Sequence, residues 1–416
     1  MSFAPTARRR GLVFLTASAM VAGLGVVAVS TANAAEPCNV RVTRLSLDNA
    51  RPFAAGGRLK RYGAAVNYPV GTTYDQHGKA VLTVYPRNAY PTLLHSKIGR
   101  RTKTGDLVKG QEPRALGAIN GDFYVTPTIR GREVEMSRGP MIKNTRVIRA
   151  QRHGGKVVGV TLSGKPYSGL VGVRGSIQSG DLPRVELQGV NWQRVKRGGV
   201  TIYTPDWSPD SSTPRPAGAA EWVINSHNKI KEKRTNTKNT GKLGNPVALG
   251  TRVIAFSRNS ALVAAGGVVG TRVDVNIRQN TDGDVTLQTA IGRGLPLIQQ
   301  GVAAPLGCDA YDHSKAARPR TMVGWTKAGN WRTFTVPGTK FVGPGLRVGG
   351  FGLAAEAAIA KKLGLWNAYE IDGGGSTTLY TRSSGGKWSR RDLYEFDKST
   401  GTYEREMPNG LAFVVP

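Results

Sequence analysis

Cysteine, histidine and acidic residues are scarce in this sequence. Its 416 residues include only two cysteines and five histidines, which excludes a disulfide-dense scaffold, and neither residue type has the spacing of a zinc site. Asp+Glu 27 stand against Lys+Arg 58, which gives a formal net charge of +31. A chain this basic attracts polyanions, whether nucleic acid, anionic lipid or phosphate-bearing polysaccharide, and the charge by itself does not choose among them.

Glycine, by contrast, is abundant. With 54 glycines and 39% hydrophobic residues, the sequence excludes a coiled coil and favours many short strands joined by turns. Residues 353–363 are rich in strong helix formers and are followed by Gly364, which predicts one clear helix. Alternating or β-branched runs predict strands at 40–45, 80–85, 156–160, 199–203 and 271–275. We therefore expect an α+β fold, a mixed, mostly antiparallel, sheet-rich domain with few helices.

The N-terminus predicts an export signal. Three arginines, Arg8 to Arg10, precede an uncharged stretch over residues 11–30, and Ala32-Asn33-Ala34 has the small residues that a signal peptidase reads. A membrane anchor is the alternative, but Gly, Ser and Thr dilute the apolar stretch. We expect residues 1–34 to be a signal peptide and the protein to be secreted without a stable membrane anchor. The arginine cluster also permits a twin-arginine signal.

The two cysteines can pair if the chain is exported. Cys38 and Cys308 would then join the start of the mature chain to a segment far along the sequence. Two buried free thiols are the alternative.

The most basic stretch of the mature chain is residues 229–242, with six basic residues and one acid. A solvated loop is the expected structure, because runs of charge are usually solvated. Electrostatic contact with a polyanion is the functional alternative.

The segment from Ala368 to Tyr380 carries the richest chemistry, and it reads as strand, loop, strand. Asp372 would lie where the first strand ends. The glycines at 373–375 let backbone N–H groups turn toward an anion without obstruction by a Cβ atom, and Ser376 and Thr377 add hydroxyl donors. A hairpin with a glycine-rich turn is the alternative.

Two further segments combine polar residues with strand patterns. Residues 118–124 place Asn120-Gly121-Asp122 between an apolar entry and an aromatic exit, although Asn-Gly is also the strongest tight-turn pair. Residues 318–325 place Arg320 just before a strand, where its planar guanidinium could hold a phosphate. An exposed arginine is the alternative there.

These segments, in this order, resemble the phosphodiester glycosidase family. The motifs that carry the resemblance are Asn120 to Tyr124; Pro140, Ile142 and Asn144; Asn191 and Arg194 with Tyr203 to Trp207; Arg320, Thr321 and Gly324; Asp372 to Thr377; and Pro408 to Leu411. The resemblance covers roughly residues 114–416, which we expect to be the catalytic domain, with residues 35–113 as a strand-rich N-terminal region packed on it. The chain departs from the family at Pro337-Gly338-Thr339, where relatives have Asp-Gly-Arg.

The resemblance implies hydrolysis of a sugar that is linked through its anomeric carbon to a phosphodiester, releasing free sugar and a phosphomonoester. A phosphate leaving group needs charge neutralisation more than a general acid, and the oxocarbenium-like sugar needs a nearby carboxylate. The expected catalytic residues are Asp372, Asp122, Arg194 and Arg320. The expected substrate-binding residues are Asn120, Gly121, Asn191, Thr321, Gly373, Gly374, Gly375, Ser376, Thr377 and Asn409.

The positive charge favours an anionic cell-wall or extracellular glycopolymer as the phosphate-bearing carbohydrate substrate, with no specific nucleic-acid partner. No cofactor is expected. The site oxygens would also suit Ca²⁺ or Mg²⁺, but no sequence pattern supports either ion. Two alternatives stay open: a noncatalytic polyanion- or wall-binding protein, and a phosphodiesterase that attacks phosphorus. The sequence determines neither the sugar nor the oligomeric state.

Overall fold

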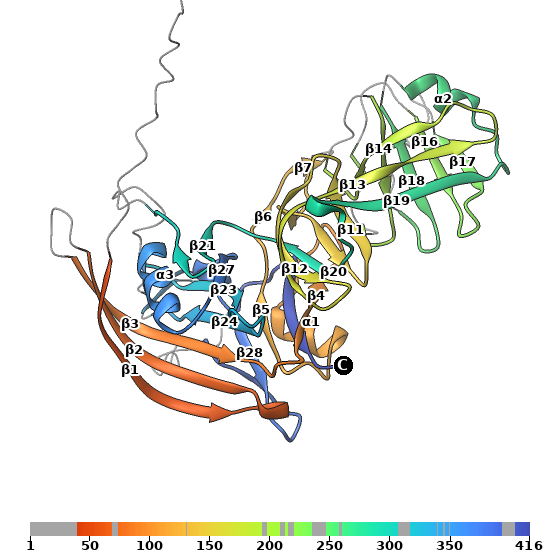
Figure 1. Cartoon of the computed structure of the whole chain (residues 1–416). Coiled ribbons are helices and arrows are strands. Elements are labelled where there is room, and N and C mark those ends of the chain that lie inside the picture. The colour runs from red at the N-terminus through yellow and green to blue at the C-terminus, as the bar shows by residue number, and fades with distance from the viewer. Residues whose placement is uncertain are drawn as a thin grey trace, which may run out of the picture. The chain divides into compact units, whose positions relative to one another are not determined.

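The structure is a computed structural model of the chain, and most of its strands belong to three sheets of eight, five and eleven strands (Figure 1). It describes residues 40–68, 74–129, 131–193, 198–208, 213–214, 220–234, 247–257, 260–306, 317–338, 340–343, 346–348, 350–392 and 404–416. The expected signal peptide, both cysteines and Arg194 lie outside these ranges. Within them, no helix is long and apolar enough to cross a membrane.

An eight-stranded sheet contains the N-terminal strands and the strand that leads to Asp372. Its order is β1 (Arg41–Pro52), β2 (Arg58–Tyr68), β3 (Tyr74–Val84), β24 (Trp331–Val336), β23 (Arg320–Trp325), β27 (Asn367–Glu370), β21 (Pro296–Gln299) and β22 (Val302–Ala303). Because β3 pairs with β24, strands from before and after residue 114 share this sheet. Helix α3 (Leu353–Lys362) packs on it through Leu353, Ala357 and Ile359, which are buried in the same apolar cluster as Leu82 and Phe334.

A five-stranded sheet contains the strand that leads to Asp122. Its order is β29 (Trp388–Arg390), β28 (Leu379–Arg382), β5 (Gly117–Asn120), β30 (Asn409–Val414) and β4 (Tyr90–His95). Helix α1 (Thr104–Gln111) covers part of this sheet, with Leu107 and Val108 packed against Leu94, Ala118 and Ala412.

An eleven-stranded sheet forms the middle of the chain. Its order is β17 (Ile230–Arg234), β16 (Glu221–Ile224), β18 (Arg252–Phe256), β15 (Val200–Tyr203), β14 (Val185–Val190), β11 (Arg146–Gln151), β10 (Met141–Lys143), β20 (Leu287–Gly292), β12 (Gly155–Thr161), β13 (Pro166–Ser179) and β19 (Val273–Thr281). An additional pairing between β13 and β14 closes the strands from β14 to β13 into a ring. Helix α2 (Ala261–Gly266) lies beside β16, where Trp222 Nε1 donates to the carbonyl of Ala264 at 3.0 Å.

Short ribbons and 3₁₀ turns complete the described elements. The ribbons pair β6 (Tyr124–Val125) with β9 (Met136–Ser137), β7 (Thr128–Ile129) with β8 (Arg132–Glu133), and β25 (Lys340–Gly343) with β26 (Leu346–Val348). The 3₁₀ turns are η1 (Ala54–Gly56), η3 (Asp282–Asp284) and η4 (Gly374–Ser376).

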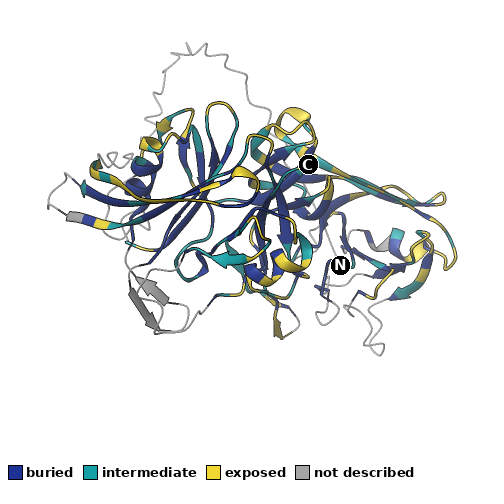
Figure 2. Cartoon of the chain, turned by 90° about the horizontal axis from the view of Figure 1, so that it is seen from below, coloured by how far each residue is buried: buried dark blue, intermediate teal, exposed yellow. Residues whose placement is uncertain are grey.

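The largest apolar core joins all three sheets. Ile119 and Leu411 enter it from the five-stranded sheet, Val323 from the eight-stranded sheet, and Ile148 and Ile291 from the eleven-stranded sheet. Figure 2 shows the strands around this core as buried. The strand ends that leave the shared core are therefore held close to one another, and the polar motifs lie at these ends.

The predicted sheet-rich, mostly antiparallel fold with few helices is confirmed. All five predicted strands and the helix at 353–363 are present, and the helix ends before Gly364, which has a φ of +84°. In the described part of the chain, β14 with β15 is the one parallel pairing between named strands.

The prediction of a solvated loop at residues 229–242 is wrong for residues 230–234. These residues form strand β17, because Ile230 is buried in the core and Arg234 reaches Glu221 on the paired strand at 3.5 Å. Residues 235–242 lie outside the described ranges.

The hairpin alternatives are also excluded. Strand β27 before Asp372 lies in the eight-stranded sheet, whereas β28 after it lies in the five-stranded sheet. Similarly, β5 and β6 on either side of Asp122 do not pair with each other. Both loops are crossovers between sheets, not tight turns.

Candidate active site

Three strand ends from three sheets meet at the polar motifs. Asp122 follows β5, Asp372 follows β27, and Arg293 follows β20. The backbone N–H of Asp372 donates to the carbonyl of Gly121 at 3.0 Å, which joins the first two strand ends. The backbone N–H of Gly294 donates to the carbonyl of Glu370 at 2.8 Å, which joins the third.

The side chain of Asn120 holds the strand ends at this junction together through three hydrogen bonds. Its amide Nδ2 donates to the carbonyl of Asp372 at 2.6 Å. Its Oδ1 accepts from the hydroxyl of Thr321 at 2.9 Å and from the backbone N–H of Thr378 at 3.0 Å. Because Asn120 and Thr321 are buried and their side chains bond each other, both residues position the loops in this structure. Their predicted contacts with substrate remain predictions.

The carboxylate of Asp122 is buried and accepts hydrogen bonds from one hydroxyl and one backbone N–H. Its Oδ2 accepts from the hydroxyl of Ser137 at 2.8 Å and from the backbone N–H of Gly139 at 2.5 Å. Burial, together with the negative charge of Asp372, raises the pKa of Asp122 to about 6. The two hydrogen bonds and the positive charge of Arg149 oppose this shift. The carboxyl group therefore changes its charge near neutral pH.

Asp372 is the more exposed of the two carboxylates. Burial, together with the negative charge of Glu370, raises its pKa to about 6. Hydrogen bonds from the Ser376 hydroxyl and the Gly373 N–H, the latter at 2.8 Å to Oδ1, lower it, as does the positive charge of Arg405. Two carboxyl groups with similarly raised pKa values thus lie within electrostatic reach of each other, an arrangement common at catalytic sites.

The glycine-rich loop adopts a conformation that needs glycine at one position. Gly374 has a φ of +60°, and its N–H donates to the carbonyl of Pro319 at 2.8 Å. Gly375 and Ser376 complete the single 3₁₀ turn, and Arg405 Nη1 donates to the Ser376 hydroxyl oxygen at 3.4 Å. Thr377 is buried, and its hydroxyl has no hydrogen-bond partner among the described residues.

A pocket of about 560 Å³ opens beside Asp122. Its wall carries two carboxylates, from Asp122 and Glu370, and three cationic side chains, from Arg138, Lys156 and Arg293. Arg138 and Lys156 are exposed. The wall therefore combines carboxylates that can act on a sugar with cations that can neutralise a phosphate.

Arg293 is the best-held of the three cations. Its Nε donates to the hydroxyl of Ser168 and its Nη1 to the carbonyl of Gly294, both at 2.9 Å. Its guanidinium also lies 4.4 Å from the ring centroid of Tyr369. Burial lowers the pKa of Arg293, but an arginine keeps its charge at neutral pH.

Arg320 does not line this pocket but contacts Glu370, which does. It is buried, and its Nη1 reaches Glu370 Oε1 at 3.4 Å. Glu356 on α3 is also buried, and burial raises the pKa of this carboxyl to about 8, with Arg320 opposing the shift and Glu370 adding to it. In this structure Arg320 positions Glu370; its predicted contact with phosphate remains a prediction.

Asn191 connects to the site only at a distance, through Arg149. Asn191 is buried with a φ of +47°, and its side chain bonds Ile148 and Thr204 within the eleven-stranded sheet. Arg149 donates to the carbonyl of Asn191 at 2.6 Å and to the carbonyl of Ser137 at 3.0 Å, and Ser137 in turn holds Asp122. Asn191 is therefore linked to the Asp122 carboxylate through two other residues, Arg149 and Ser137, and does not contact it directly in this hydrogen-bond chain.

The remaining predicted residues lie against Asp122. Asn409 Oδ1 accepts from the backbone N–H of Asp122 at 2.9 Å. A Cβ atom at Gly121 would collide with the side chain of Asn409 and come within 2.7 Å of its carbonyl oxygen, so glycine is required there. In the described ranges no group of three or more His, Cys, Asp or Glu is placed to hold a metal ion.

Comparison with known proteins bears on this site. Residues 219–414 match the phosphodiester glycosidase family. This range is a little under half of the chain, and it contains the motifs at Arg320, Asp372 and Asn409 but not those at Asp122 and Asn191. The resemblance inferred from the motifs is confirmed by this match. No curated protein matches the chain by sequence.

Solved structures share the fold. A hypothetical protein from Synechocystis is 18% identical with a TM-score of 0.61, and the alignment covers 91% of this chain and 72% of that one. A protein from Burkholderia pseudomallei K96243, assigned as exported, is 15% identical with a TM-score of 0.65, covering 92% and 99%. The zebrafish N-acetylglucosamine-1-phosphodiester alpha-N-acetylglucosaminidase catalytic domain, auto-inhibited by its pro-peptide, is 14% identical, covering 90% and 87%, but its TM-score of 0.40 supports no argument.

Sequence reasoning missed the cations that line the pocket. Arg138 and Arg293 each precede a glycine, and both lie at an element boundary in Ser137-Arg138-Gly139 and Gly292-Arg293-Gly294. A charged residue beside glycine at the end of an apolar strand is the pattern that could have found them. Lys156 and Glu370 lie within strands and carry no such signal.

Proposed function

We propose that this protein is a secreted hydrolase that cleaves the glycosidic C–O bond of a sugar-1-phosphodiester, releasing free sugar and a phosphomonoester. The observation that carries the proposal is the pocket beside Asp122, in which carboxylates face three cationic side chains. The match of the C-terminal part to phosphodiester glycosidases supports the same reaction class.

The cations serve the leaving group. As the anomeric C–O bond breaks, its electron pair stays on the phosphate oxygen, and negative charge grows there. Arg293, Lys156 and Arg138 line the pocket where this charge would be neutralised. Since a phosphomonoester is a weak base, it leaves with little help from a general acid.

The carboxylates serve the sugar. Asp122 and Asp372, ionised above about pH 6, would stabilise the positive charge that develops at the anomeric carbon, and one of them would accept a proton from the attacking water or attack the carbon itself. Glu370, which is held by Arg320, is the second carboxylate on the pocket wall beside Asp122.

We also infer that the substrate is an anionic cell-wall or extracellular glycopolymer. The formal net charge of +31 and the export signal predicted at residues 1–34 support this inference. Equal turnover of neutral and anionic glycan phosphodiesters at low salt would contradict it.

Turnover by carboxylate variants tests the proposed reaction. The substrate is a simple N-acetylglucosamine-1-phosphodiester, and Asp122→Asn and Asp372→Asn are compared with Asp106→Asn, an exposed carboxylate on α1. We expect kcat to fall by about 100-fold or more in the first two variants and to be unchanged in the third. Undiminished turnover in both site variants would refute the assignment.

A further inference from the structure

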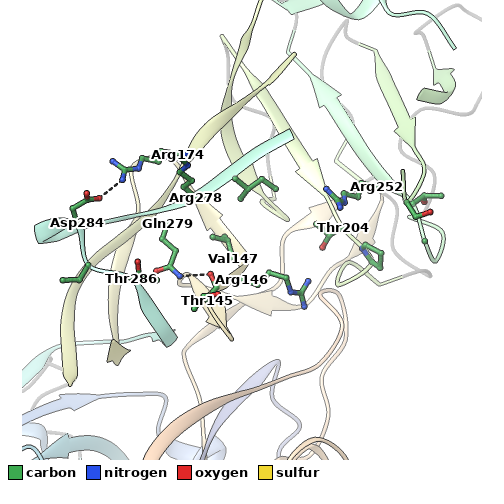
Figure 3. A pocket seen from close by; sticks show the side chains of 16 residues that line it. Thr145, Arg146, Val147, Arg174, Thr204, Arg252, Arg278, Gln279, Asp284 and Thr286 are labelled. Atoms are coloured by element: carbon green, nitrogen blue, oxygen red, sulfur yellow. Dashed lines mark hydrogen bonds and ion pairs between the residues drawn. The ribbon is translucent and has the colours of Figure 1, made fainter. Parts of the chain in front are cut away.

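A second pocket lies in the eleven-stranded sheet, and the proposed reaction does not use it. Its volume is about 690 Å³, and four arginines line it: Arg146 on β11, Arg174 on β13, Arg252 on β18 and Arg278 on β19 (Figure 3). None of the residues that line it also lines the pocket beside Asp122. It is therefore a separate feature of the surface.

Two of the four arginines are already paired. Arg146 Nη1 lies 2.6 Å from Asp206 Oδ2, and Arg174 Nη2 lies 2.6 Å from Asp284 Oδ1. These pairs hold two guanidinium groups at the pocket wall, although both arginine side chains are more than half exposed, at 58% and 51%. Arg174 and Asp284 are exposed on both sides of their pair, and exposed pairs are weak, so an incoming anion can compete for Arg174.

The other two arginines provide the uncompensated charge. Within the described ranges neither Arg252 nor Arg278 has a carboxylate at ion-pair distance, and Arg278 Nε donates to the neutral side chain of Asn276 at 3.2 Å. Arg278 is exposed and Arg252 partly exposed. Two guanidinium groups without a carboxylate partner therefore line the pocket, Arg278 on β19 and Arg252 on β18, and each can offer bidentate donors to an anion.

The rest of the lining is suited to hydroxyl-bearing ligands. Five hydroxyl residues line the pocket: Thr145, Thr204, Ser226, Thr251 and Thr286. The hydroxyls of Thr204 and Thr251 donate to Asp206 and to the carbonyl of Ala248 and can still accept from a ligand. Gln279 is held in place, because its Nε2 donates to the carbonyl of Thr145 at 2.7 Å. No Trp, Tyr or Phe lines the pocket, so it has no platform on which nucleic-acid bases could stack.

We propose that this arginine pocket is a second substrate-binding site, which takes the phosphodiester groups of a polymer of phosphodiester-linked sugars or polyols. The arginines bind the phosphates, and the hydroxyl side chains contact the sugar or polyol between them. The preference for anions rests on the arginines alone, whereas the choice of a phosphodiester polymer rests on the proposed function. Such a site holds the polymer on the enzyme apart from the bond that is cleaved.

Binding of poly(glycerol phosphate) to the full chain tests the proposal. This probe has phosphodiesters and hydroxyls but no base, and its affinity is measured by fluorescence anisotropy over a range of salt concentrations. The double variant Arg252→Ala/Arg278→Ala is compared with Arg44→Ala/Arg58→Ala, which removes the same charge from exposed positions on β1 and β2. Because the readout is binding, it does not depend on whether the chain turns over a sugar phosphodiester.

We expect the Arg252/Arg278 variant to bind poly(glycerol phosphate) at least about tenfold more weakly, with a salt dependence whose log–log slope is flatter by about 1.5. The Arg44/Arg58 variant should bind like the wild type. Wild-type affinity in the first variant, or an equal loss in both variants, would overturn the proposal in favour of a nonspecific response to net charge. Tighter binding of an oligothymidylate of matched charge would overturn it in favour of a nucleic-acid site.

Discussion

At the residue scale, Asp122 owes its properties to the small residues around it. A Cβ atom at Gly139 would lie 2.8 Å from Asp122 Oδ2, and one at Gly292 would collide with the same oxygen. The two glycines leave room for a buried carboxylate that, among the described residues, accepts from the Ser137 hydroxyl and the Gly139 N–H. Burial with few donors explains the raised pKa, and a raised pKa has a cost in stability.

Asp122→Asn should show that cost. The pKa of Asp122 is raised from 3.8 to about 6 in the folded chain, so its contribution to stability is complete below about pH 4 and is lost as the pH rises through about 6. Asparagine does not ionise. The unfolding free energy of the variant relative to the wild type should therefore increase between pH 4 and pH 8, by on the order of 3 kcal/mol.

Chemical denaturation at the two pH values measures this difference, with Asp106→Asn as the exposed control. A relative stability that stays constant or decreases toward pH 8 would show that the carboxyl group titrates normally.

Arg293→Ala should separate phosphate recognition from folding. Its guanidinium lines the pocket and bonds Ser168 and Gly294, all at the surface of the junction and not in its core. Loss of a charge-assisted contact with phosphate should lower kcat/KM for a sugar-1-phosphodiester by about 10- to 100-fold. Steady-state kinetics beside Arg132→Ala, an exposed arginine on β8, checks this; equal kcat/KM for the two variants would exclude Arg293 from the site.

At the scale of elements, helix α3 carries a buried acid that supports the site from behind. Glu356 lies in its first turn, and neither carboxyl oxygen has a hydrogen-bond partner among the described residues. Arg320 lies between this group and Glu370 and interacts with both electrostatically. A neutral Glu356 leaves the charge of Arg320 directed to Glu370, which faces the pocket.

Glu356→Gln should consequently be tolerated. Because burial raises the pKa of Glu356 to about 8, its contribution to stability is lost as the pH rises toward and through that value. The melting temperature of the variant relative to the wild type should rise by several degrees between pH 5 and pH 9. Thermal unfolding across this range, with the exposed Glu133→Gln as control, gives the answer; a relative melting temperature that falls would mean that Glu356 is ionised and paired.

The sequence predicted individual strands and the main helix but not how the strands pair into sheets. Strands and the helix at 353–362 could be predicted, because their apolar periodicity and the glycine that ends the helix are local. The sequence could not predict that β27 and β28 belong to different sheets, because a hairpin and a crossover between sheets have the same strand–loop–strand sequence pattern. Asp122 and Asp372 could be predicted as site residues from their local motifs. The position of Arg293 beside them could not, because it depends on the shared core that packs β20 near β5.

At the scale of the whole molecule, charge and topology act together. Each of the two pockets has at least three cationic side chains on its wall, so part of the positive charge of the sequence lies at concave surfaces. One pocket has the carboxylates needed to break a bond, and the other has hydroxyls and arginines suited to holding a chain. This division favours a polymeric anionic substrate over a small diffusible one.

The central claim is that this chain breaks the bond between carbon and oxygen and not the bond between oxygen and phosphorus. Hydrolysis of an N-acetylglucosamine-1-phosphodiester in ¹⁸O-labelled water, with mass spectrometry of both products, distinguishes the two. Our account predicts the label on the sugar. Labelled water attacks the anomeric carbon near Asp122 and Asp372, either in the substrate itself or in a covalent intermediate between the sugar and one of these carboxylates. Label on the phosphomonoester would mean attack at phosphorus and would contradict it.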